Sequence, residues 1–360
     1  MTDYTRRLFL HRVAASLGFL TSGWVLGGCR AGDLPLTSEA VEPSPATAAP
    51  TATTAGPTNG AEAPATSPNT PTVEDTVAPA PTATSAPSAS HPDLAVARGG
   101  DADAMVSRAV AALGGMERFV KAGDDVIVKP NICVAYHTYE YAATTNPWVV
   151  GTLVRLALEA GARRVRVMDY PFGGSAEQAY VNSGIKEQVE RAGGEMEVMS
   201  RFKFVDADIP AGIDLQRCKI YDAVLKADVV IDVPIAKHHN LARLTLGMKN
   251  LMGVIWDRPA MHRNLGQRLA DLSSRVRPTL TVVDAVRMLM NHGPTGGNLD
   301  DVKTANTVIV SPDLIAADSY AATLFDLAPS ELAYVTAGAA MGLGSSDLQA
   351  LKIEEITVGG

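Results

Sequence analysis

The chain has 360 residues and a formal net charge of −8. An acidic chain that lacks a block of Lys and Arg is a poor candidate for binding nucleic acid or anionic lipid headgroups. Its three cysteines, Cys29, Cys133 and Cys218, cannot hold an iron–sulfur cluster of the four-cysteine kind. The two beyond Cys29 allow at most one disulfide.

Residues 1–28 have the pattern of an export signal peptide. Arg6 and Arg7 precede an apolar run from Val13 to Leu26, and a basic region followed by an apolar one is the order found in such signals. The paired arginines are typical of a twin-arginine signal, with an ordinary basic region as the alternative. The apolar run is shorter than the roughly 20 residues that a transmembrane helix needs.

The end of this signal predicts a lipid anchor. Leu26-Gly27-Gly28-Cys29 resembles the lipobox of bacterial lipoproteins, so Cys29 would become the acylated first residue, with a chance thiol as the alternative. The rest of residues 29–92 is rich in Pro, Thr and Ala, a composition that favours a disordered tether. We therefore expect an exported protein whose lipidated Cys29 anchors it to the outer face of the cytoplasmic membrane, or otherwise an extracytoplasmic location.

Residues 93–360 are expected to form an α/β domain. Short β-rich runs alternate with helical patterns, which indicates a largely parallel or mixed sheet with helices on both faces. The expected helices include Pro147–Ala160 and Ile185–Ala192, each stopped by glycine, and Asn264–Ser274. The expected strands are Asp125–Lys129, Arg163–Asp169, Glu195–Ser200, Asp228–Val233, Leu280–Asp284 and Asn306–Ser311.

Polar residues follow several of these strands, at the sheet edge where α/β proteins bind ligands. The first strand ends in Lys129, with Asn131 just beyond it, and His238 and His239 follow the fourth strand, at the end of an apolar run. These side chains favour water or a partner over an apolar core. We expect Lys129 and Asn131 to orient a small anion.

The histidines are candidate metal ligands and acid–base groups. In a loop, His238 and His239 could both turn inward, and His292 could join them around a divalent metal. The alternative is one structural and one solvated histidine. His262 is a further candidate, and a buried, inert Cys133 is favoured over a nucleophile. Any of three aspartates could orient a histidine: Asp169, Asp284 and Asp318.

Two glycine-rich turns and one helix complete the candidate site. Gly173-Gly174-Ser175 has the spacing of a helix cap and could expose backbone N–H groups to an anion, and the turn with Gly296 and Gly297 could do the same. A cap without a ligand is the alternative. Apolar spacing predicts a helix from Leu244 to Met252. This helix would carry Lys249 as a catalytic candidate, with a solvated lysine as the alternative, and Asn250 as a substrate-binding candidate.

Three segments together resemble the domain-of-unknown-function family 362. They are Val128-Lys129-Pro130-Asn131, the run from Lys237 to Gly253 with its Lys-Asn-Leu-Met-Gly ending, and Asn291-His292-Gly293-Pro294-Thr295-Gly296-Gly297. Some members carry an added ferredoxin-like cysteine cluster, from which this chain departs. The family is also distantly similar to lactate racemase-type domains with a nickel-containing cofactor, and that analogy concerns the fold.

The sequence thus predicts a metal- or cofactor-dependent enzyme that acts on a small anionic substrate. A tethered receptor that binds a solute without chemistry is the alternative. The reaction, the identity of the metal and the oligomeric state stay open.

Overall fold

The computed structural model describes residues 91–359. The predicted signal peptide, Cys29 and all but the last two residues of the predicted tether lie outside the described residues. Within residues 91–359, no helix combines the length and the apolar character needed to cross a bilayer.

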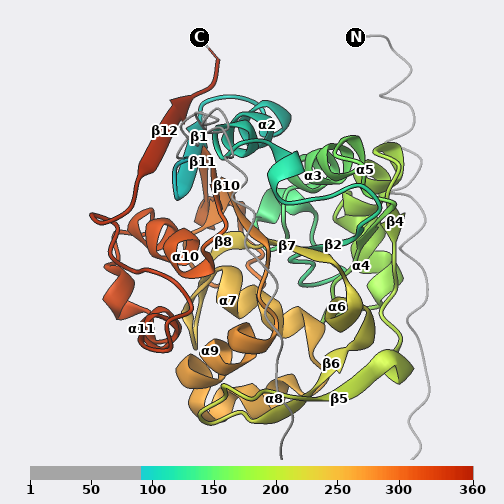
Figure 1. The fold of residues 1–360 in the computed structure, drawn as a ribbon, viewed down its shortest axis with the longest axis vertical. Helices are drawn as coiled ribbons and strands as arrows, with labels where there is room; N and C mark the ends of the chain where they lie inside the picture. Colours follow the sequence, from blue (N-terminus) through green and yellow to red (C-terminus); the bar gives the residue numbers. More distant parts are fainter. Residues whose placement is uncertain (1–90, 360) are drawn as a thin grey trace, which may run out of the picture. The chain divides into compact units, whose positions relative to one another are not determined.

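The described residues form strands and helices in alternation (Figure 1). The strands are β1 (Leu94–Arg98), β2 (Asp125–Pro130), β3 (Arg164–Val167), β4 (Glu195–Met196), β5 (Phe204–Asp208), β6 (Arg217–Tyr221), β7 (Val229–Val233), β8 (Ile235–His239), β9 (Arg243–Thr245), β10 (Leu280–Leu289), β11 (Val302–Ser311) and β12 (Ile353–Thr357). The α-helices are α2 (Ala102–Ala112), α3 (Pro147–Glu159), α4 (Ala176–Asn182), α5 (Ile185–Arg191), α6 (Asp222–Lys226), α7 (Gly247–Asn250), α8 (Arg258–Met261), α9 (Leu265–Arg275), α10 (Leu314–Thr323) and α11 (Ala333–Ala340).

Most strands join one mixed sheet in the order β12-β1-β11-β10-β7-β2-β3-β4, while β8 pairs with β10 and with β9. Strands β10, β7, β2, β3 and β4 pair in parallel. Strand β11 is antiparallel to both β1 and β10. Strands β5 and β6 form a separate antiparallel pair. The parallel half brings the carboxyl ends of β2, β3 and β7 to one edge.

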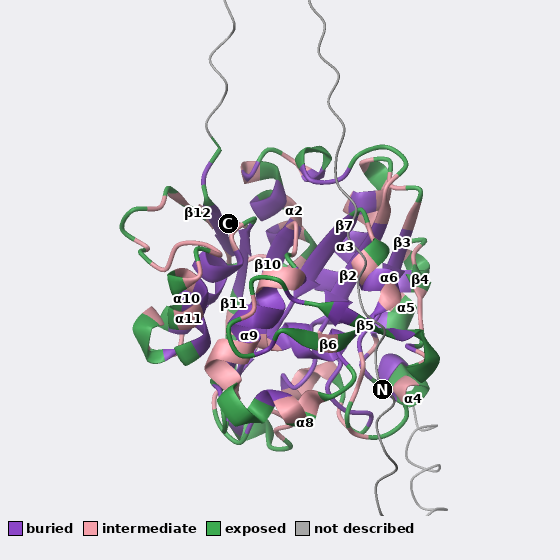
Figure 2. Ribbon diagram, turned by 60° about the horizontal axis from the view of Figure 1, so that its bottom comes forward, coloured by how far each residue is buried: buried purple, intermediate pink, exposed green. Residues whose placement is uncertain are grey.

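Helices cover both faces of the sheet, with α2, α3 and α5 on one face and α7, α9 and α10 on the other (Figure 1). Successive strand residues point to opposite faces. In β2, Val126 and Val128 therefore contribute to one apolar core, whereas Ile127 contributes to the other. The buried strands lie between these helical layers, whose outer sides are exposed (Figure 2). This arrangement confirms the predicted α/β class.

The segment from Leu244 to Met252 is not the single helix that its apolar spacing predicted. Strand β9 takes its first residues, α7 spans only Gly247–Asn250, and a 3₁₀ turn continues from Leu251 to Val254. The strand pairing of Leu244 with His238 outweighs the local helical pattern. The sequence also did not predict five other strands. These are β8, which follows β7, the pair β5 and β6, and the strands β1 and β12.

Helix α7 is held in place by a buried carboxylate of α10. Asp318 is fully buried, and its two oxygens accept hydrogen bonds from the backbone N–H groups of Gly247 and Met248, at 2.6 and 2.9 Å. A Cβ at Gly247 would lie only 2.9 Å from Asp318 Oδ1. The glycine thus permits the close approach that fixes the start of α7.

Replacing Asp318 with Ala should lower the free energy of unfolding by about 2–4 kcal/mol, because two buried N–H groups lose their acceptor and a cavity forms. Chemical denaturation measures this loss. Asp300→Ala, at an exposed position, is the control and should change stability by about 0.5 kcal/mol or less. Equal effects of the two variants would contradict the role given to Asp318.

Candidate functional site

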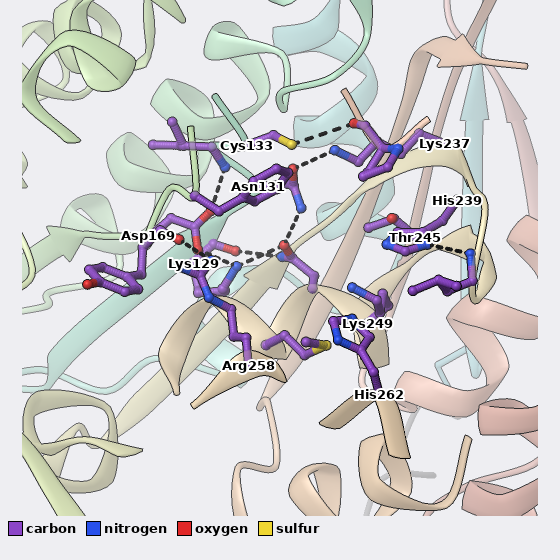
Figure 3. A pocket seen from close by; sticks show the side chains of 18 of the residues that line it. Lys129, Asn131, Cys133, Asp169, Lys237, His239, Thr245, Lys249, Arg258 and His262 are labelled. Atoms are coloured by element: carbon purple, nitrogen blue, oxygen red, sulfur yellow. Dashed lines mark hydrogen bonds and ion pairs between the residues drawn. The ribbon is translucent and has the colours of Figure 1, made fainter. Parts of the chain in front are cut away.

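A cavity of about 580 Å³ lies at the carboxyl-end edge of the sheet (Figure 3). Strand β2 leads into Lys129 and Asn131, β8 carries His239, and α7 carries Lys249 and Asn250. These five predicted site residues all line the cavity. The structure thus brings these polar residues, which come from separate elements, to one cavity.

A chain of hydrogen bonds joins the polar residues at the base of the cavity. Lys129 Nζ forms an ion pair with Asp169 Oδ1 at 2.8 Å and donates to Asn250 Oδ1, also at 2.8 Å. Asn131 Nδ2 donates to the same Asn250 oxygen at 2.9 Å. Lys237 Nζ in turn donates to Asn131 Oδ1 at 3.0 Å. The network fixes two buried lysines next to the cavity.

Three cations of the cavity, Lys237, Lys249 and Arg258, have no carboxylate partner among the described residues. Lys237 is 1% exposed; its amine donates to Asn131 and to the backbone oxygen of Ala143, at 2.6 Å, and also contacts the Cys133 thiol. Arg258 donates to the backbone oxygen of Tyr170, at 2.6 Å, and lies over the Tyr170 ring. Lys249 makes no hydrogen bond or ion pair through its side chain in this part of the chain. Asp169, the cavity's acidic residue, is already paired with Lys129.

Burial is the largest cause of the pKa shifts of two lysines in the cavity. Burial, followed by the nearby charge of Lys237, lowers the pKa of Lys249 to about 8. Burial also lowers the pKa of Lys237. Asp232, which lies behind Asn250 and accepts from its Nδ2 at 2.8 Å, has a pKa raised well above its ordinary value by burial. Burial thus opposes the charged form of Asp232.

His239 lines the cavity as a neutral ring. Burial and the charge of Lys249 lower the pKa of His239 to about 3. Its Nδ1 accepts backbone N–H groups from Leu241 and Ala242 at 3.1 and 3.3 Å. A neutral imidazole with an accepting Nδ1 carries its proton on Nε2. The free edge of His239 is consequently a hydrogen-bond donor.

The other predicted metal ligands do not meet His239. Because Lys237–His239 belong to strand β8 and not to a loop, His238 and His239 point to opposite sides, and the expectation that both turn inward is wrong. His238 Nδ1 accepts from Gly293 N at 3.1 Å, and His292 Nδ1 contacts Asp301 at 2.8 Å. Within residues 91–359, no group of three or more His, Cys, Asp or Glu side chains is placed to hold a metal ion. The described residues do not fit the predicted histidine metal site, and we assign no step to a metal.

The glycines of the two glycine-rich turns do not line the cavity. Ser175 caps α4 by accepting from Gln178 N at 3.2 Å. A Cβ at Gly173 would lie 2.8 Å from a Val134 methyl group, and Gly174 has a φ of +81°, so close backbone packing explains both glycines. Gly296 and Gly297 also have positive φ angles. Their turn contributes Pro294 to the cavity, while the glycines themselves do not line it.

The three aspartates that could orient a histidine contact other groups instead. Asp169 pairs with Lys129, and Asp318 caps α7. Asp284 accepts the backbone N–H groups of Asn146 and Val286, at 2.7 and 3.0 Å. Cys133 lines the cavity as a free thiol, and burial raises its pKa, which agrees with an inert cysteine.

Two lining residues were not expected from the sequence. Arg258 begins the short helix α8 directly before Pro259, a place where an arginine is usually solvated. Thr245 is 3% exposed, and its hydroxyl oxygen has no hydrogen-bond partner among the described residues. A buried hydroxyl without a partner in a cavity wall is available to a ligand. His262, an open candidate, also lines the cavity.

Comparison with known proteins places the chain in a family. The family described as "Domain of unknown function (DUF362)" matches residues 126–323. The chain belongs to the DUF362 family. The matched residues contain Lys129, His239, Lys249 and Arg258, so the cavity is part of the DUF362 domain.

Several proteins are similar to this DUF362 chain. The thylakoid-associated protein sll1697 of Synechocystis is 27% identical over 241 residues, which cover 64% of this chain and 72% of that protein. The lactate racemase apoprotein of Thermoanaerobacterium thermosaccharolyticum has a TM-score of 0.37 and 9% identity, with 59% of this chain and 53% of the racemase covered. A Thermotoga maritima protein has a TM-score of 0.33 and 12% identity, with half of each chain covered. The chain thus spans about half of each solved structure, and these structural similarities are too low to carry an argument about activity.

Gly253 keeps the Lys129–Asp169 pair in place, because a Cβ at this position would overlap the Asp169 carboxylate and lie 2.6 Å from Lys129 Nζ. Gly253→Ala should therefore separate the pair and lower the free energy of unfolding by about 3 kcal/mol. Calorimetry and a crystal structure of the variant measure both effects. Gly342→Ala controls for the general effect of replacing a glycine, since Gly342 has a φ of +69° and open space around it; it should cost about 1 kcal/mol. An intact ion pair in the Gly253 variant would contradict this role.

Proposed function

We propose that the DUF362 domain of this chain is an enzyme that binds a small organic anion in the cavity and transfers a proton with Lys249. The observation that carries the proposal is the set of three cations, Lys237, Lys249 and Arg258, which lack a carboxylate partner among the described residues around a cavity of about 580 Å³.

Electrostatics supports an anionic ligand. Removing an ammonium group from water is unfavourable unless charge or hydrogen bonds compensate for the lost hydration. Lys129 has Asp169 as compensation, whereas Lys237 contacts two neutral oxygens and the Cys133 thiol, whose pKa is raised by burial. A carboxylate or phosphate in the cavity would supply the missing negative charge. The unpartnered Thr245 hydroxyl and the Nε2–H of His239 are further donors for such a group.

The chemistry of Lys249 supports an enzyme over a receptor. A pKa of about 8 lets this amine lose and regain a proton near neutral pH, which suits a general acid or base. Lys237 is held by two acceptors, and Arg258 stays charged at all relevant pH values. These two groups suit orientation of the anion, and His239 would donate a hydrogen bond. A non-catalytic solute receptor would use the same cations but would not require a lysine that titrates.

The proposal includes export and a lipid anchor at Cys29. Its support is the sequence of residues 1–29, in which paired arginines, an apolar run and Leu26-Gly27-Gly28-Cys29 follow one another. The anchored domain would meet its substrate outside the cytoplasm.

Substitution of Lys249 tests the anion site. Propionate and phosphate, compared with chloride at constant ionic strength, should raise the melting temperature of the wild-type protein by mass action. Lys249→Met should weaken the binding of the stabilising anion about tenfold or more, because a charged contact is lost. The control Lys186→Met, on the exposed side of α5, should bind as the wild type does.

The same assay gives a pH dependence with a defined sign. Burial lowers the pKa of Lys249 to about 8, so its ammonium attracts the anion below pH 8 and is lost above it. Wild-type affinity should fall between pH 7 and 9, while His239 stays neutral throughout. Lys249→Arg should retain binding and show a weaker fall. A melting temperature that no organic anion or phosphate raises above the chloride value would overturn the proposed function.

Replacement of Cys29 tests the anchor. In a bacterium that exports the protein, the wild-type chain should fractionate with membranes and incorporate labelled palmitate. Cys29→Ser removes the thiol that would be acylated, so the variant should appear in the soluble extracytoplasmic fraction without label. Cys218→Ser is the control and should behave as the wild type does. Membrane association that persists unchanged in Cys29→Ser would exclude the lipid anchor.

A further inference from the structure

Three large apolar side chains are exposed where they line the cavity. Phe172, Leu241 and Trp256 are 57%, 68% and 40% exposed, and all three belong to its wall. They come from separate connections, after β3, between β8 and β9, and before α8. We call these three residues the apolar rim.

Single exposed apolar residues are common on protein surfaces and need no explanation. Phe202 and Ile213, which are 82% and 66% exposed, are such residues and do not line the cavity. The apolar rim differs because three connections bring its members to one opening.

Part of the rim is built into the core. The Trp256 ring lies 5.4 Å from the Phe204 ring and 5.7 Å from the Tyr170 ring, measured between centroids. Tyr170 also lies beneath the Arg258 guanidinium, at 4.7 Å. An aromatic surface therefore runs from the rim to one of the cations that lack a carboxylate partner.

We infer that the ligand of this cavity is an amphipathic anion, with a carboxylate or phosphate at the cations and an apolar group against Phe172, Leu241 and Trp256. The inference rests on the proposed function and narrows its substrate class. Charge complementarity supports this occupant, because Lys237 and Arg258 lie in the same cavity as the rim. Lys237 is almost fully buried, so a ligand must enter the cavity to reach it. A small molecule inside the cavity can contact both the cations and the apolar rim, because both line the same cavity.

A series of linear carboxylates from acetate to hexanoate tests this inference on the full-length protein. Affinities are measured by calorimetry and thermal shift at constant ionic strength. Each added methylene should tighten binding about twofold to fourfold, as expected for partial burial of a CH₂ group. Phe172→Ser and Leu241→Ser should flatten this dependence and leave the affinity for acetate within about twofold of the wild type. Phe202→Ser and Ile213→Ser match these changes away from the cavity and should preserve the wild-type dependence.

The outcomes separate the inference from the proposed function. If acetate binds but chain length has no effect, the inference is overturned and the anion site stands. If no carboxylate or phosphate binds, both are overturned. A third arm uses phosphatidylglycerol vesicles and full-length Cys29→Ser protein, which lacks the proposed lipid. Vesicle binding that Leu241→Ser abolishes, without any dependence on carboxylate length, would identify the rim as a membrane-docking surface and overturn the inference.

Discussion

The side-chain amide of Asn250 connects the parts of the cavity that come from different strands. Its oxygen accepts from Lys129 and Asn131, and its nitrogen donates to Asp232. Asn250 is 1% exposed, so its hydrogen bonds are not shared with bulk water and a displaced amide would leave buried groups unsatisfied. The position of Asn250 thus fixes the ends of β2 and β7 relative to α7.

Helix α7 is too short to hold such a position alone, since isolated helices need about 12 residues or more to be even marginally stable. Asp318 and the surrounding core supply the constraint from outside, and Gly247 and Gly253 let the neighbouring carboxylates approach. Lys249 lies between these fixed points. Its amine keeps its place in the cavity wall without an acidic partner among the described residues, because the backbone around it is fixed by other contacts.

The sequence was sufficient to predict the α/β class, the parallel core strands and the convergence of Lys129, Asn131, His239, Lys249 and Asn250. These features depend on local apolar patterns and on the rule that parallel strands end at one edge. Strand β8 could not be predicted in this way, because Lys237-His238-His239 is polar and becomes a strand only by pairing with the following strand β9 and the distant strand β10.

The same non-local contacts explain the other differences. Gly173 and Gly174 have the sequence pattern of an anion-binding turn, yet the nearby side chains of Val134 and Ala135 account for them. From the sequence, Arg258 looks like a surface residue at a helix start. In the fold it contacts Tyr170 and lines the cavity.

The cations of the cavity are divided by how firmly they are held. Lys129 and Lys237 are tied to the hydrogen-bond network, and Arg258 is tied to backbone oxygens. Their positions are therefore fixed before a ligand arrives, which reduces the reorganisation that binding requires. Lys249 has no such bonds among the described residues, and its pKa of about 8 makes its charge responsive to a bound anion. An anion near Lys249 favours the ammonium form of this side chain. Binding would therefore protonate Lys249 at the position where proton transfer is proposed.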